Sequence, residues 1–233
     1  MFVGHYGVSF AAKRGDGTIP LWVLFVAVQL LDVSWSLFVF FGIEKVRIVP
    51  GITASNPLDL YYMPYTHSLV AALLWSLGAY VASRAIRVFG ASHRAALLVA
   101  LAVFSHWVLD FFVHRPDLPL YDDTLKVGLG LWNHRAVAFL LEVAVLFGGM
   151  FLYLRSTAAT TALGRYGMPV FGVVMLIVQA VVFFGPPPPS ATAAPIEALA
   201  FYVVFAAVAR WLERRRNSVG GDPAGGVEGN AVG

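Results

Sequence analysis

Long apolar stretches separated by short polar segments dominate the chain. Six of them are close to the roughly 20 residues that a helix needs to cross the hydrocarbon of a bilayer. They lie at 21–43, 62–83, 95–114, 134–154, 168–185 and 195–212. None alternates as a half-buried strand does, and only helices and closed barrels satisfy the backbone in lipid. The pattern predicts an all-α membrane protein with about six transmembrane helices in a domain at 15–216.

Composition supports a membrane protein and removes several kinds of chemistry. Hydrophobic residues make up 59% of the 233 residues and charged residues 12%, against about 25% charged in a typical soluble domain. A soluble fold of this length could not bury so much apolar surface. The absence of cysteine excludes disulfides, thiolate metal ligands and cysteine nucleophiles. A formal net charge of +3 is small and gives no indication of nucleic-acid binding.

Basic residues are unevenly divided between the two sides of the predicted bundle. Eleven of the 16 fall on the side that holds both ends of the chain, and five fall on the other. The larger group is Lys13, Arg14, Arg84, Arg87, Arg94, Arg155, Arg165, Arg210, Arg214, Arg215 and Arg216. Since loops rich in lysine and arginine stay in the cytoplasm, both termini are predicted to be cytoplasmic, and the 44–61 and 115–133 loops to face outward.

The two ends of the chain differ from the spans. Segment 1–14 is apolar up to Lys13 and Arg14, the reverse of the charge order in a secretory signal, and it is too short to span. We interpret it as a half-helix that dips into the bilayer from the cytoplasmic side. An amphipathic segment lying on the membrane surface is the alternative. Segment 217–233 is rich in glycine and poor in large apolar residues, which predicts a disordered cytoplasmic tail.

Ionisable residues are concentrated in the first four predicted spans. Such groups are costly in lipid and usually face the bundle interior. His106, Asp110 and His114 are spaced four apart, which places them on one helix face. The two histidines would be about 12 Å apart along the axis, so one ion could not readily bind both. A histidine held by a neighbouring carboxylate for packing is the alternative for any single pair.

Other candidate ligands are expected at a similar depth. Asp32 lies about halfway along the first span, His67 and His134 lie toward the outer face, and His5 on the half-helix reaches toward Asp32. Imidazole and carboxylate ligands suit zinc, manganese or iron, and we expect zinc. The candidate metal ligands are His5, Asp32, His67, His106, Asp110, His114 and His134.

Several other polar residues receive different interpretations. Glu142 is either a partner of a ligand or a packing group, and both alternatives stay open. His93 and the outer-loop acids Asp117, Asp122 and Asp123 are interpreted as solvated residues.

Four short motifs, taken in order, resemble the bacterial inner-membrane metal-dependent hydrolases, a family distantly similar in motif order to zinc-dependent phospholipase C. The motifs are Gly4-His5…Ser9, Leu31-Asp32, Thr66-His67-Ser68-Leu69 and Ser105-His106-x-x-x-Asp110, within about 1–119. Where the family has Asp-x-Asp-His, this chain has Asp32-Val33-Ser34-Trp35. Where the family has His-Arg-Gly before Thr-His-Ser, it has Tyr62-Met63-Pro64. These departures remove potential ligands, which His114 and His134 could replace.

The resemblance implies a hydrolase embedded in a bacterial inner membrane. A bound divalent ion would activate a water for attack on an ester or phosphoester, with a membrane lipid as the natural substrate near the outer leaflet. Asp110, Thr66 and Ser68 are the candidate catalytic residues, Thr66 or Ser68 by orienting a ligand or the substrate. The alternatives are a metal or proton pathway, a haem protein with histidine ligands, and a structural or degenerate membrane protein.

Overall fold

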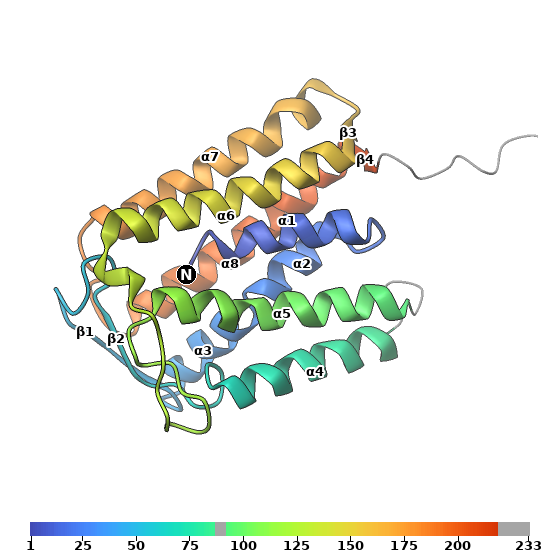
Figure 1. Ribbon diagram of the computed structural model, residues 1–233. Coiled ribbons are helices and arrows are strands. Elements are labelled where there is room, and N and C mark those ends of the chain that lie inside the picture. The colour runs from blue at the N-terminus through green and yellow to red at the C-terminus, as the bar shows by residue number, and fades with distance from the viewer. Residues whose placement is uncertain (87–91, 219–233) are drawn as a thin grey trace, which may run out of the picture.

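The computed structural model describes residues 1–86 and 92–218, which form a bundle of eight α-helices (Figure 1). The helices are α1 His5–Gly15, α2 Leu21–Val28, α3 Leu30–Phe40, α4 Leu69–Ala85, α5 His93–Val113, α6 Arg135–Ser156, α7 Ala162–Phe184 and α8 Ala193–Glu213. Arg87 and positions 219–233 of the predicted tail lie outside the described residues.

Four helices, α5 to α8, are long and apolar enough to cross a membrane, and the pair α2–α3 is a fifth candidate if it counts as one bent span. The chain is therefore a mostly helical integral membrane protein, with four or five candidate spans in the part that the structure describes. The predicted spans at 95–114, 134–154 and 195–212 coincide with α5, α6 and α8 to within a few residues. α7 begins at Ala162, six residues before its predicted start, because Thr161 caps it by accepting a hydrogen bond from the Gly164 amide.

The first predicted span, 21–43, is wrong as a single straight helix. α2 and α3 meet at Gln29 with a bend of 54°. The backbone amide of Gln29 bonds to Val26, in the pattern of a tight turn, and its side-chain amide donates to the Phe2 carbonyl at 3.1 Å. The break also leaves the Val28 carbonyl free to accept a bond from another helix. Apolar residues flank the break on both sides, so hydropathy alone does not reveal it.

The second predicted span, 62–83, begins too early. Tyr62 ends a strand, and α4 starts only at Leu69, where the Ser68 hydroxyl accepts a hydrogen bond from the Ala71 amide. Its 17 residues reach about 26 Å, short of the roughly 30 Å of hydrocarbon. Residues 63–68 form an irregular segment before it, and this segment carries His67.

Short strands lie at both ends of the bundle (Figure 1), so the predicted all-α class omits two small sheets. β1 Lys45–Ile48 pairs antiparallel with β2 Leu58–Tyr62 at the end that also holds the 310 turn η1 Leu131–Asn133. At the other end, β3 Thr157–Ala159 pairs with β4 Arg216–Ser218. The first two residues of the predicted tail, 217 and 218, thus belong to a strand.

The N-terminal segment forms α1, which lies among the other helices (Figure 1). Tyr6 and Phe10 are fully buried in the core that α1 shares with α2, α6 and α8. Gly7 and Gly149 let α1 and α6 approach so closely that a Cβ at either position would overlap the backbone of the other helix. α1 is therefore an interior helix, while its depth relative to the bilayer stays a prediction.

Candidate metal centre

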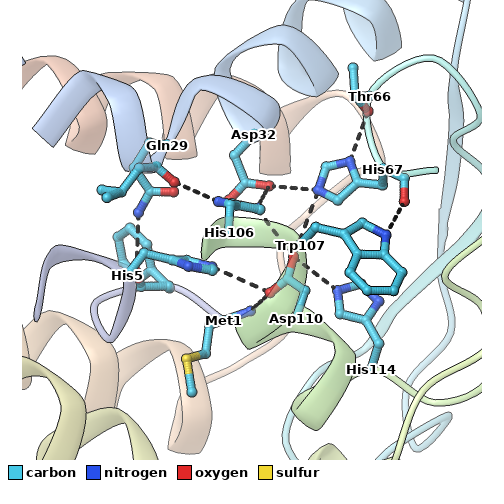
Figure 2. Close-up of polar contacts among 12 residues, drawn as sticks. Met1, His5, Gln29, Asp32, Thr66, His67, His106, Trp107, Asp110 and His114 are labelled. Atoms are coloured by element: carbon cyan, nitrogen blue, oxygen red, sulfur yellow. Dashed lines mark hydrogen bonds and ion pairs between the residues drawn. The ribbon is translucent and has the colours of Figure 1, made fainter. Parts of the chain in front are cut away.

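Three polar side chains of the site come from α5 and its C-terminal end. His106, Asp110 and His114 are all buried, at 0%, 2% and 2% exposure. His106 Nε2 lies 3.1 Å from Asp110 Oδ2, and His114 Nε2 lies 3.5 Å from the same oxygen. The four-residue spacing thus places one carboxylate between two imidazoles, as Figure 2 shows.

Asp32 and His67 join this group from two irregular parts of the chain. Asp32 lies in the first turn of α3, just after the break, and His67 lies in the segment before α4. Asp32 Oδ1 is 3.3 Å from His67 Nε2 and 3.4 Å from His106 Nε2. His67 Nε2 is 3.8 Å from Asp110 Oδ2. Asp32 and Asp110 therefore face the same nitrogen atoms from two sides.

His5 enters from α1 and contacts Asp110 and His106, whereas the sequence placed it beside Asp32. Its Nε2 lies 3.3 Å from Asp110 Oδ1, and its ring stacks on the His106 ring at 3.9 Å between centroids. The segment before α1 is held by Glu142 of α6, which accepts hydrogen bonds from the Phe2 and Gly4 amides. Of the two open interpretations of Glu142, the structure thus gives it a supporting role for the segment that carries His5.

We call His5, Asp32, His67, His106, Asp110 and His114 the His/Asp cluster. Outside this cluster, the remaining sequence candidates have other roles. Ser68 caps α4 and donates to the Pro64 carbonyl at 2.8 Å. The side chain of His134, just before α6, is exposed, so the fold does not bring it into the buried cluster.

Two histidines of the cluster have their Nδ1 atoms fixed by hydrogen bonds. His106 Nδ1 is 2.6 Å from the Val28 carbonyl oxygen, which can only accept, so Nδ1 carries the proton. His67 Nδ1 is 2.8 Å from Thr66 Oγ1, and that hydroxyl donates to Glu44 Oε2 at 2.6 Å. Thr66 therefore accepts from His67. In both rings Nε2 then faces Asp32 and Asp110, with a lone pair if the ring is neutral and with an N–H if it is protonated.

His114 is fixed in the same way by an acid that the sequence analysis interpreted wrongly. Asp117 was expected to be solvated, but it is buried and its Oδ1 lies 2.9 Å from His114 Nδ1. Arg115 Nε donates to the other Asp117 oxygen at 3.0 Å, and Arg115 also pairs with Asp59 of β2. Asp117 becomes buried because a loop folds back over the end of α5, and spacing along the helix could not indicate that.

Other contacts to the cluster had no clear signal in the sequence. Glu44, which follows α3, accepts hydrogen bonds from the amides of Tyr65 and Thr66, and burial raises the pKa of its carboxyl. Tyr202 of α8 donates to Asp32 Oδ2 at 2.8 Å, and the amino nitrogen of Met1 contacts Asp110 Oδ1. Long-range contacts of this kind bring α8 and the start of the chain to the same site.

A cavity of about 190 Å³ leads away from the cluster. Asp32, His67, Asp110 and His114 line one part of it. The rest is mostly apolar and aromatic, with walls from α7, α8, β2 and the loop that carries Trp132. The cluster is therefore in contact with a space that a small molecule, or part of a larger one, can fill.

Two overlapping sets of side chains could hold a metal ion, with ligand atoms within 4.8 Å of one another. They are His5, His106 and Asp110, and Asp32, His67 and His106. Both offer imidazole nitrogen and carboxylate oxygen, the donors typical of zinc, manganese and iron sites. Within residues 1–86 and 92–218, His106 Nε2 and both ring nitrogens of His5 are buried without a hydrogen-bond partner, and a bound cation would take one nitrogen from each ring.

Comparisons with protein-family models, with curated proteins and with solved structures found no match. The likeness to the inner-membrane hydrolases consequently rests on the four short motifs alone.

Proposed function

We propose that the protein is a membrane-embedded, metal-dependent hydrolase that cleaves an ester or phosphoester, with a lipid as substrate. One observation carries the proposal. The Nε2 atoms of His67, His106 and His114 lie 3.1–3.8 Å from carboxylate oxygens of two aspartates, Asp32 and Asp110. The Nδ1 atom of each of these histidines is hydrogen-bonded to an acceptor. A carboxylate oxygen this close to a ring nitrogen requires a positive charge, which either a metal ion between the two atoms or a second proton on the imidazole supplies, and we propose the metal ion.

The support for a metal comes from the pattern of hydrogen bonds around the histidines. Histidines that ligate metals commonly donate their second ring N–H to a carboxylate, a carbonyl or water, which fixes the tautomer and the ring orientation. Here the acceptors are the Val28 carbonyl, Thr66 and Asp117. His5, Asp32, His67, His106 and Asp110 would hold the ion, and His114 lies beside Asp110.

A bound divalent cation supplies acidity to a water ligand and polarises the carbonyl or phosphoryl oxygen of a substrate. The chain's own residues orient the groups around it. Thr66 and Asp117 hold two imidazoles in place, and apolar cavity walls limit the access of water. Asp110 is our candidate for the group that accepts a proton, because this residue lines the cavity and its Oδ2 lies among three imidazoles.

Metal content is the decisive measurement. Protein purified in detergent without chelator should hold at least about one divalent ion per chain, measured by elemental mass spectrometry. The double variant His106→Ala Asp110→Ala should fall to background. The matched control is His93→Ala, because His93 is an exposed histidine whose Nδ1 bonds to Tyr80 instead of the cluster.

Hydrolysis is tested on the same samples with ester and phosphodiester substrates in mixed micelles. A chelator should abolish turnover, and added zinc should restore it in the wild type and in His93→Ala. Wild-type protein that takes up no zinc even on titration would disprove the metal centre and the hydrolase together.

A second candidate, a proton pathway, is favoured by one further observation. His5, Ser9 and Lys13 are buried four residues apart on α1, and Lys13 reaches Glu213 at 2.6 Å toward the other end of the bundle. Ser9 donates to the Leu24 carbonyl at 3.0 Å. Positions four apart on a helix are about 6 Å apart, so water would have to connect these groups. Proton flux into liposomes that Ser9→Ala abolishes would favour this candidate over the hydrolase.

We also propose the orientation that the basic residues predict, with both termini in the cytoplasm of a cell bounded by an inner membrane. A reporter that is active only outside the cytoplasm should give signal when fused after Lys126 and none when fused after Arg216. Equal signals at the two positions would disprove the orientation.

A further inference from the structure

Gln179 is a polar side chain in an otherwise apolar part of α7. From 167 to 184 it is the only residue whose side chain is able to form strong hydrogen bonds. The side chain is fully buried, and neither its amide oxygen nor its amide nitrogen has a hydrogen-bond partner in the described part of the chain. A buried amide without partners costs free energy, so its position calls for a partner that the protein itself does not supply.

The position of Gln179 relative to the cavity indicates where such a partner would lie. Gln179 lines the same cavity as Asp32 and Asp110. Next to it the wall is apolar, with Phe183 from α7 and Phe201 from α8. Gln179 therefore presents an amide inside an apolar region that is continuous with the His/Asp cluster.

The size of the cavity limits what can occupy it. About 190 Å³ is less than the roughly 300–1,000 Å³ of common small-molecule sites. It holds a polar group and a few chain atoms but not a whole lipid. Phe201 is partly exposed at this wall, so an apolar chain can continue past it toward the lipid-facing side of α8.

The charges around the cavity favour a neutral group at Gln179. Four carboxylates line it, those of Asp32, Asp110, Glu142 and Glu197, while the lining contains no lysine or arginine and its Met1 amino group already contacts Asp110. A primary amide both donates and accepts, so it matches a group that does the same. A hydroxyl or an amide fulfils this requirement, whereas an anion would use only the amide N–H and would face four carboxylates.

We propose that Gln179 binds a neutral hydroxyl or amide of an amphiphilic ester. The apolar chain of this ligand lies along Phe183 and Phe201, and its ester group faces Asp32 and Asp110. The substrate class is thus a partly acylated polyol or an N-acylated amphiphile. The statement about hydrolysis rests on the proposed function, whereas the binding of the ligand does not.

The test uses two probes that differ only at the proposed contact. The first is 1-monolauroyl glycerol, and the second is the same ester with both free hydroxyls methylated. The protein is reconstituted in phosphatidylcholine nanodiscs with a chelator present, so that nothing is hydrolysed. Binding is followed by tryptophan fluorescence, because Trp35 and Trp132 line the cavity. The wild type should bind the hydroxyl form about five- to tenfold more tightly, as expected for one hydrogen bond to a buried neutral group.

Two variants on the same helix separate hydrogen bonding from packing. Gln179→Met keeps the length of the side chain without the amide, and it should reduce the ratio of the two affinities to about one. Val182→Met also alters the cavity wall, and it should leave the ratio at the wild-type value. If Gln179→Met does not fold, Gln179→Asn retains the amide but shortens its reach, and the ratio of the two affinities should then fall between one and the wild-type value.

The outcomes distinguish this proposal from the proposed function. An unchanged ratio in Gln179→Met, or no preference in the wild type, would overturn the role of Gln179, and water bound to Gln179 would give that result. The chelator is then removed, zinc is added, and cleavage of the hydroxyl form of the ester is measured. Tighter binding of the hydroxyl form without any cleavage would support the role of Gln179 and overturn the hydrolase. Cleavage without tighter binding of the hydroxyl form would support the hydrolase and overturn the role of Gln179.

Discussion

α5 and the α2–α3 pair both deliver an aspartate to the same site, but they do so in different ways. Asp110 lies on an uninterrupted helix, where regular spacing places His106 and His114 on the same face. Asp32 lies just after a break, and it meets His67 and His106 only through the fold. The first arrangement is determined locally and the second by tertiary contacts, so they should respond differently to substitution.

The largest effect on zinc affinity should come from replacing either aspartate, and the two losses show which of the two arrangements contributes more to metal binding. Asp110 faces four imidazoles, those of His5, His67, His106 and His114, whereas Asp32 faces two. Asp110→Ala should lower zinc affinity more than the roughly 10–100-fold typical of losing a partner of a ligand, and Asp32→Ala should have a smaller effect. Competition with a chelating dye measures both. A greater loss for Asp32→Ala would show that the aspartate after the break is the principal ligand.

A smaller effect should follow from changing the break itself. Gln29→Leu removes the bond to the Phe2 carbonyl and favours a continuous helix, in which the Val28 carbonyl would bond along the helix and release His106. We expect about tenfold weaker zinc binding with little loss of folded protein. Gln179→Leu is the control, because it makes the same chemical change at another buried glutamine. Equal zinc affinities in the two variants would mean that the break does not position the ligands.

The smallest effect on the metal should come from Ser68, which the sequence grouped with the catalytic residues. Ser68→Ala removes the cap of α4 and should cost about 1 kcal/mol of stability. Zinc affinity should stay near the wild-type value, because the other Ser68 contact is to the Pro64 carbonyl. Thermal unfolding followed by circular dichroism gives the first quantity and dye competition the second. A large loss of zinc affinity with unchanged thermal stability would show that Ser68 takes part in the metal site.

The contrast between these regions also explains what the sequence could predict. The helices α5, α6 and α8 follow from hydropathy, and the His/Asp face of α5 follows from helical spacing. The break at Gln29 could not be predicted from hydropathy, because apolar residues flank it on both sides, and the late start of α4 was missed because the predicted span joined the polar segment at 64–68 to the apolar residues that follow it. Gln29, Pro64 and Ser68 were the local signals. Glu44, Asp117 and Tyr202 reach the site through loop folding and distant helices, which no periodicity encodes.

The contacts of α1 have a consequence for the order of assembly in the cell. Its first residues are held by Glu142 of α6, and Lys13 at its far end pairs with Glu213 of α8. The ribosome makes α1 long before α6 and α8. Asp32 accepts a hydrogen bond from Tyr202, which lies on α8 and is therefore made after α6. During synthesis, the segments that carry His5 and Asp32 therefore lack these stabilising contacts until the last helices have been made. All the residues of the His/Asp cluster are synthesised by the C-terminal end of α5, but the contacts from Glu142, Glu213 and Tyr202 that hold His5 and Asp32 in place are complete only after α8 has been made, so tight metal binding is expected to be a late, post-translational step.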